Sequence, residues 1–181
     1  SSIEDSSTSG ITGTKGSASN PTEADGKVGK AQHYDSATER ITLEDSSAFT
    51  WTPVTQERTV SAWFYPTALP ANDGDPFQFI VTSGAPGNRY QFVFYTTSGQ
   101  TFLLCAVSSN DWTPIGYFYA PWSPSLNTWH HVTFVAGSAG NNRIVVNGAA
   151  ALVTESSWDD TTSCNPTTTA IKDAYGNSTG T

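Results

Sequence analysis

The sequence predicts an all-β fold in which two antiparallel sheets lie face to face as a sandwich. Short segments of alternating polar and apolar residues recur about every 12 residues, and a period of two is the pattern of half-buried strands. Turn residues separate these segments, and no segment shows the capped 3.6-residue period of a long helix. Many short strands at regular spacing are typical of a two-sheet sandwich or a jelly roll.

The alternation itself places the strands. Residues 40–44, Arg-Ile-Thr-Leu-Glu, form the first clear alternating segment. Further strands are predicted at 59–65, 77–82, 90–95, 102–107, 115–119, 129–135, 143–146 and 150–154. Segment 90–95 is apolar on both faces, which we expect where the outer face of a sheet is covered or faces a ligand.

Residues 1–181 are predicted to form one domain, because the chain has the length of one domain rather than two. Residues 1–25 are rich in Ser, Thr and Gly and are expected to form an irregular leading segment with one short strand candidate at 11–14. The clearest turn is Asn147-Gly148, since both residue types accept the positive φ angles of a type I′ hairpin turn.

Composition and charge narrow the classes of partner. The net charge is −8 and the eight Lys and Arg residues form no patch, so nucleic acid is excluded and acidic partners are disfavoured. No apolar run approaches the roughly 20 residues of a membrane helix. The low share of charged residues, 13%, with abundant Ser, Thr, Gly and Asn, leads us to expect an extracellular protein, at a cell or particle surface.

Cys105 and Cys164 are the two cysteines. Neither lies in a C-x-x-C motif or a His/Cys cluster, so a zinc or redox site has no support. A disulfide between them and two buried free thiols both agree with the sequence, because the sequence does not give their separation.

Four segments in order resemble one known family. Residues 26–35, G-K-V-G-K-A-Q-H-Y-D, resemble G-K-x-G-x-A-x-x-F-D, and residues 58–66, R-T-V-S-A-W-F-Y-P, resemble F-T-I-S-A-W-V-K-P. Residues 126–132, L-N-T-W-H-H-V, and 143–148, R-I-V-V-N-G, resemble its later strand and hairpin. Together they resemble the LamG-like jelly-roll family of the concanavalin A-like lectin and glucanase superfold, over residues 5–180.

The resemblance implies where the large rings and the last strand lie. Trp63 and Trp129 fall inside strands, where we expect each indole to bridge two sheets about 10 Å apart. The family ends with a strand of the type F-x-G-x-I-D-E-V-R-I-Y, which the segment 176–181 does not contain. We therefore expect the sandwich to lack its last strand, which a longer chain or a donated strand of another protein chain would supply.

The chemistry expected of the chain is binding rather than catalysis. Glycoside hydrolysis needs two carboxylates that flank the bond, and the E-x-D-x-x-E strand of laminarinase-like relatives is absent. His130 and His131 lie in the W-H-H-V strand, where one ring is expected to face the core and the other the surface. The chain is therefore predicted not to be an enzyme.

One loop is a candidate calcium site. Asn72, Asp73 and Asp75 surround Gly74 with the hard oxygen ligands that Ca²⁺ prefers. A plain Asx-rich turn explains the same residues equally well, and the pair Asp159-Asp160 is a second option. No cofactor is expected to be required, and calcium is the metal that the sequence favours.

Sugar binding needs exposed aromatic faces beside planar polar groups. The candidate loop aromatics are Trp51, Trp112, Tyr117, Tyr119, Trp122 and Trp158, and the candidate polar residues are Asn88, Arg89, Asn110, Asp111, Asn141, Asn142 and Arg143. The segment 110–122 holds the densest mixture, so Trp112, Tyr117, Tyr119 and Trp122 are predicted to form the ligand face.

Two functions remain open at this point. The first is a carbohydrate-binding, lectin-like module of an exported or surface protein. The second is a structural or adhesion domain of a cell surface, filament or virus particle, held by protein contacts. The first depends on fold analogy and loop aromatics, and the second on the low charge and the expected missing strand.

Overall fold

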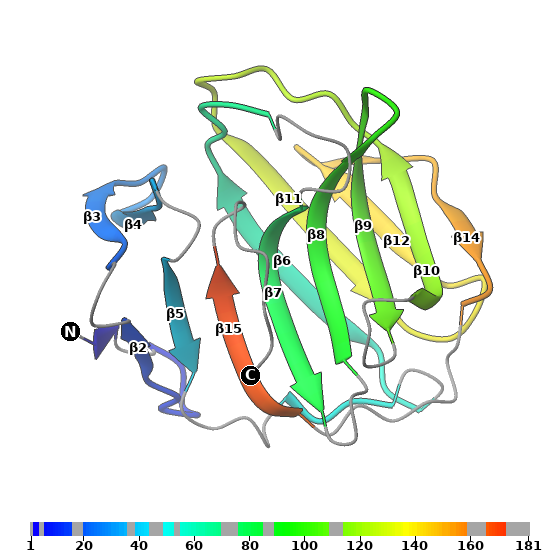
Figure 1. The fold of residues 1–181 in the computed structure, drawn as a ribbon, viewed down its shortest axis with the longest axis horizontal. Coiled ribbons are helices and arrows are strands. Elements are labelled where there is room, and N and C mark those ends of the chain that lie inside the picture. The colour runs from blue at the N-terminus through cyan, green and yellow to red at the C-terminus, as the bar shows by residue number, and fades with distance from the viewer. Residues whose placement is uncertain are drawn as a thin grey trace.

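The computed structural model describes residues 2–3, 6–15, 20–35, 39–43, 49–52, 55–69, 76–84, 89–108, 114–158 and 166–172. The regular elements in these ranges are all strands, numbered β1 to β15. Figure 1 shows two sheets that face each other, with β6, β11 and β12 crossing behind β7 to β10, and a separate hairpin of β3 and β4. The predicted all-β sandwich is confirmed.

The larger sheet has nine strands in the order β1-β2-β5-β15-β7-β8-β9-β10-β14. Their bounds are β1 Ser2–Ile3, β2 Gly13–Lys15, β5 Arg40–Leu43, β15 Pro166–Lys172, β7 Pro76–Gly84, β8 Arg89–Thr97, β9 Gln100–Ser108, β10 Pro114–Pro121 and β14 Thr154–Ser156. Each strand is antiparallel to its neighbours.

The smaller sheet has four strands in the order β13-β12-β11-β6. Their bounds are β13 Ala149–Ala150, β12 Arg143–Val146, β11 His130–Ala136 and β6 Arg58–Phe64. A separate hairpin joins β3, Thr22–Asp25, to β4, Lys30–His33. Asn147 and Gly148 have φ of 52° and 82°, which confirms the predicted type of hairpin turn between β12 and β13.

Aromatic side chains from both sheets meet in the core. Phe92 of β8 lies 5.3 Å from Phe134 of β11 between ring centroids, and Phe94 lies 5.9 Å from Phe64 of β6. Phe92, Phe94 and Phe134 are at most 1% exposed. Each pair joins the nine-stranded sheet to the four-stranded sheet, so burial of these rings holds the two layers together.

The central strands match the sequence prediction because their alternation is a local property. In β8, residues 90–94 are buried on both faces, including Gln91 at 7% and Val93 at 0% exposure, as their apolar pattern indicated. The leading segment 1–25 was expected to be irregular, and this is wrong in part. It contributes β1 and β2 to the edge of the large sheet and β3 to the hairpin.

The segment 176–181, where the family's last strand was expected to be absent, lies outside the described residues, so that expectation stays a prediction. The structure adds a strand just before it. β15 was not predicted, yet it pairs with β5 on one side and with β7 on the other. The end of the described chain is therefore placed inside the nine-stranded sheet and has partners along both edges. Among the described residues, β6 and β13 are the end strands of the four-stranded sheet, and β1 and β14 are those of the nine-stranded sheet.

Cys105 is a free thiol with 0% exposure. It lies in β9 opposite Phe92 of β8 and Phe118 of β10, and Cys164 lies outside the described residues. Of the two states that the sequence left open for Cys105, the structure has the buried free thiol. Burial raises the pKa of the Cys105 thiol well above its usual value, so the reactive thiolate is disfavoured at neutral pH.

Candidate functional site

The outer face of the four-stranded sheet carries large side chains in contact with solvent. Along β6, Val60 and Phe64 pack against the core, so the odd-numbered residues between them point to the opposite face. Trp63 is accordingly 44% exposed. The prediction that its indole bridges the two sheets is wrong, because the pleat places Trp63 on the outside.

Two pairs of rings form a cluster on this face, which we call the aromatic row: Trp63, Tyr65, Trp129 and His131. Trp63 lies 5.0 Å from the ring of His131, its partner across β6 and β11. Tyr65, 41% exposed, lies 5.1 Å from the ring of the half-buried Trp129. Trp129 stands next to Tyr65 on the outer face and does not bridge the sheets either.

Hydroxyl groups continue the outer face next to the aromatic row. Ser61 Oγ lies 2.8 Å from His131 Nε2 and 3.1 Å from Thr133 Oγ1. His130 instead is 7% exposed, and its Nε2 lies 3.0 Å from the carbonyl oxygen of Ser125. The expectation that one histidine faces inward and the other outward is confirmed.

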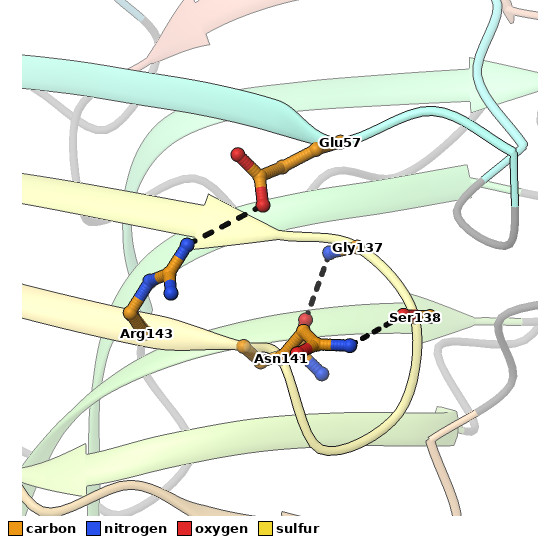
Figure 2. Close-up of polar contacts among 6 residues, drawn as sticks. Glu57, Gly137, Ser138, Asn141 and Arg143 are labelled. Carbon is orange, nitrogen blue, oxygen red and sulfur yellow. Dashed lines mark hydrogen bonds and ion pairs between the residues drawn. The ribbon is translucent and has the colours of Figure 1, made fainter.

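The far end of the same face is charged and polar. Val135 of β11 pairs with Arg143 of β12 on one side and with Thr59 of β6 on the other. The Arg143 guanidinium donates to Glu57 Oε2 at 3.4 Å. Figure 2 shows this pair beside the loop that joins β11 to β12. A pocket of about 220 Å³ opens there, lined by Thr55, Gln56, Glu57, Gly137, Ser138, Asn141 and Arg143.

Polar contacts, two of them buried, fix the loop that lines this pocket. The Asn142 side chain accepts from Gly137 N at 2.9 Å and donates to Glu155 Oε1 at 2.8 Å. Glu155 Oε2 also accepts from Gly140 N at 2.9 Å, and Trp158 Nε1 donates to the Gly137 carbonyl at 2.8 Å. Because these groups satisfy one another, the loop is held in one arrangement.

The outer face therefore combines the two features that sugar recognition requires. Rings at one end offer apolar faces for stacking, and the planar amide of Asn141, the guanidinium of Arg143 and the carboxylate of Glu57 offer hydrogen bonds at the other. From Tyr65 to Glu57 the strand extends about 26 Å at 3.3 Å per residue. The face can accommodate an extended ligand along β6.

The residues predicted to form the ligand face are not on one surface. Tyr117 and Tyr119 lie on the outer face of the nine-stranded sheet, 5.8 Å apart between ring centroids, and Tyr119 lies 5.4 Å from Phe102. Trp122 lies on the core side, 5.2 Å from Phe94. The predicted residues Trp112, Asn110, Asp111 and Asn88 lie outside the described residues, and of Arg89 only the backbone is described.

The candidate calcium ligands Asn72, Asp73 and Asp75 also lie outside the described residues and stay a prediction. The part of the chain that the structure describes contains no group of three or more His, Cys, Asp or Glu side chains that could hold a metal ion. Within the same ranges, no helix has the length and apolar character needed to cross a membrane.

The aromatic row was missed because the aromatic residues were sorted into loops and strands rather than by face. The signal was present in the sequence: Val60 and Phe64 fix the parity of β6 and leave Trp63 on the other side. The loop residues Trp51 and Trp158 were expected to be candidate ligand residues. They are buried, at 1% and 9% exposure.

These layers define a class of protein, the antiparallel β-sandwich of the lectin-like kind. The family model of the concanavalin A-like lectin/glucanases superfamily matches residues 35–180. The chain belongs to this superfamily, and the resemblance that the four motifs indicated is confirmed. No curated protein matches the chain. Because the superfamily includes both binding modules and glucanases, function has to be argued from the site.

Proposed function

We propose that this domain is a non-catalytic carbohydrate-binding module of an exported or surface protein, and that it binds glycan on the outer face of the four-stranded sheet. The observation that carries the proposal is the aromatic row, in which Trp63 and Tyr65 are 44% and 41% exposed. Contiguous patches of exposed aromatic side chains mark ligand or partner sites on soluble proteins. The polar groups around Arg143 supply the complementary hydrogen bonds.

The carboxylates near this face support a binding role. Glu57 forms an ion pair with Arg143, and Glu155 accepts hydrogen bonds from Gly140 and Asn142. Glycoside hydrolysis needs one carboxylic acid and one free carboxylate on either side of the bond. Glu155 is engaged by the loop, whereas the exposed Glu57 beside Arg143 remains accessible to sugar hydroxyls. This division fits a module that holds sugar without cleaving it.

Trp63→Ala is expected to weaken glycan binding by about 10- to 30-fold, because a central tryptophan carries about 2 kcal/mol in a binding site. A glycan array identifies the ligand, and isothermal titration gives the affinities. Tyr119→Ala is the matched control, since it removes an aromatic ring from the outer face of the other sheet. Equal losses in both variants, or binding to no glycan at high concentration, would count against the proposal.

The unpaired edge of β6 favours a second candidate function, in which a strand of another protein pairs with this domain. His131 N–H donates to Asn147 Oδ1 and its carbonyl accepts from Asn147 N, both at 2.8 Å, so these groups point toward β12. Trp63 is paired with His131, and its own N–H and C=O therefore point away from β11, as do those of Ser61 by alternation. In the described residues no strand lies on that side.

A strand from another protein could pair with these free groups, as in a structural or adhesion domain of a cell surface, filament or virus particle. Light scattering over a range of concentrations tests this alternative on the chain itself. A rise in mass that Ser61→Pro suppresses would support it, since proline removes the N–H on the open edge. A constant monomeric mass at all concentrations would argue against it.

A further inference from the structure

A lysine from the separate hairpin lies against the aromatic row. Lys27 Nζ is 5.8 Å from the centroid of the Trp63 ring, within the range of a cation–π contact. Lys27 belongs to the turn between β3 and β4, where Gly26 N donates to the Gly29 carbonyl at 2.9 Å. Gly29 has a φ of +60°, which glycine adopts without strain. The turn therefore presents Lys27 to the exposed indole.

The two lysines of this hairpin differ in their partners. Lys30 Nζ lies 2.8 Å from Asp25 Oδ1 and 3.8 Å from Glu23 Oε1, so its charge is matched within the hairpin. Lys27 has no ion pair among the described residues, and the Trp63 ring is its recorded contact. Within the described ranges the charge of Lys27 is thus balanced by an aromatic ring alone, which leaves its ammonium group available to an incoming anion.

A sugar that stacks on Trp63 has to share the ring with this ammonium group. A neutral sugar that displaces the cation offers it only uncharged hydroxyl acceptors. A sugar with a carboxylate offers the ammonium a charge-assisted hydrogen bond, which is stronger than an exposed cation–π contact. We propose that the module selects glycans that contain uronic acid, and that Lys27 binds the carboxylate of the sugar stacked on Trp63. This inference rests on the proposed function.

The net charge of −8 opposes a polyanion at long range but does not decide the local contact. In about 0.15 M salt the Debye length is about 8 Å, so distant acidic residues are largely screened. A carboxylate that touches Lys27 is within that length. Selection for uronic acid is therefore expected to be clearest at this salt concentration and to be masked by repulsion in salt-free buffer.

The test compares an oligogalacturonate with its methyl ester, which has the same backbone without the negative charge. Isothermal titration is done with the full chain at neutral pH, as wild type, Lys27→Gln and Lys30→Gln. Lys27→Gln is expected to weaken binding of the acid about fivefold and to strengthen binding of the ester about twofold. Lys30→Gln is the matched control, because it makes the same change of charge on the same hairpin and should leave the ratio within about twofold.

The outcomes separate this inference from the proposed function. If Trp63→Ala leaves binding of both ligands unchanged, the aromatic row is not the binding site. That result would contradict both the proposed function and this inference. If Trp63→Ala weakens both but Lys27→Gln and Lys30→Gln change the acid-to-ester ratio equally, the binding face stands and the role of Lys27 is overturned. A wild-type preference for the ester, or binding of neither ligand, also overturns the selection for uronic acid.

Discussion

Phe134→Ala is expected to lower the free energy of unfolding by about 3–5 kcal/mol, the usual loss when a buried phenylalanine is truncated. Phe134 is 1% exposed and its ring lies 5.3 Å from that of Phe92. One ring comes from each sheet, so the cavity opens at the interface between the layers. Urea unfolding followed by tryptophan fluorescence measures the loss.

Thr133→Ala is the matched control for this experiment. Thr133 is the preceding residue of β11, but it lies on the outer face, where its hydroxyl contacts Ser61 at 3.1 Å. Its truncation is expected to cost no more than about 1 kcal/mol. The double variant with Phe92→Ala should lose less than the sum of the two single changes, because both remove the same contact. A loss for Phe134→Ala as small as that for Thr133→Ala would contradict this core.

Ala62→Pro is expected to unfold the domain or to destabilise it severely, whereas Ser61→Pro is expected to be tolerated. Ala62 is paired with Val132, and the alternation that turns His131 toward β12 turns the main chain of Val132 toward β6. Proline at 62 thus leaves a carbonyl of β11 unpaired, which alone costs about 1–3 kcal/mol, and adds the steric cost of a ring inside the ladder.

Ser61 has its N–H on the open edge, where a proline removes no hydrogen bond of the sheet. Ser61→Ala is the control for the side chain. It keeps the N–H but loses the contact of the Ser61 hydroxyl with His131, which is 2.8 Å in the wild type. Circular dichroism and urea unfolding of the three variants give the comparison. Equal destabilisation by proline at 61 and at 62 would mean that the N–H of Ser61 has a partner.

The strands could be predicted from the sequence because each one is a local pattern. Arg143 to Val146 and the Asn147-Gly148 turn were placed correctly, since turn chemistry and alternation agree there. β15 was missed because its sequence, P-T-T-T-A-I-K, has little apolar alternation. Its position is determined by pairing with β5 and β7, which are distant in the chain and give no signal within the segment itself.

The sequence predicted the types of residue in the candidate site but not which residues form it. The sequence indicated that aromatic and planar polar residues would form a ligand face, but it did not show which side of a sheet each ring occupies. Trp51 is in a loop, yet its ring is buried and its Nε1 donates to the Gln56 carbonyl at 2.6 Å. Trp63 is in a strand, yet it is exposed. Position relative to the pleat, rather than the type of segment, decides exposure.

The location of β15 has a consequence for the way this polypeptide is made. Among the described residues, β1, β2 and β5 join the rest of the nine-stranded sheet only through β15. These strands are synthesised before β15, so they cannot pair with it until residues 166–172 have emerged from the ribosome. Pairing across so long a stretch of chain is slow. A nascent chain released before Pro166 would leave β5 and β7 without their shared neighbour, and is expected to be degraded or to aggregate.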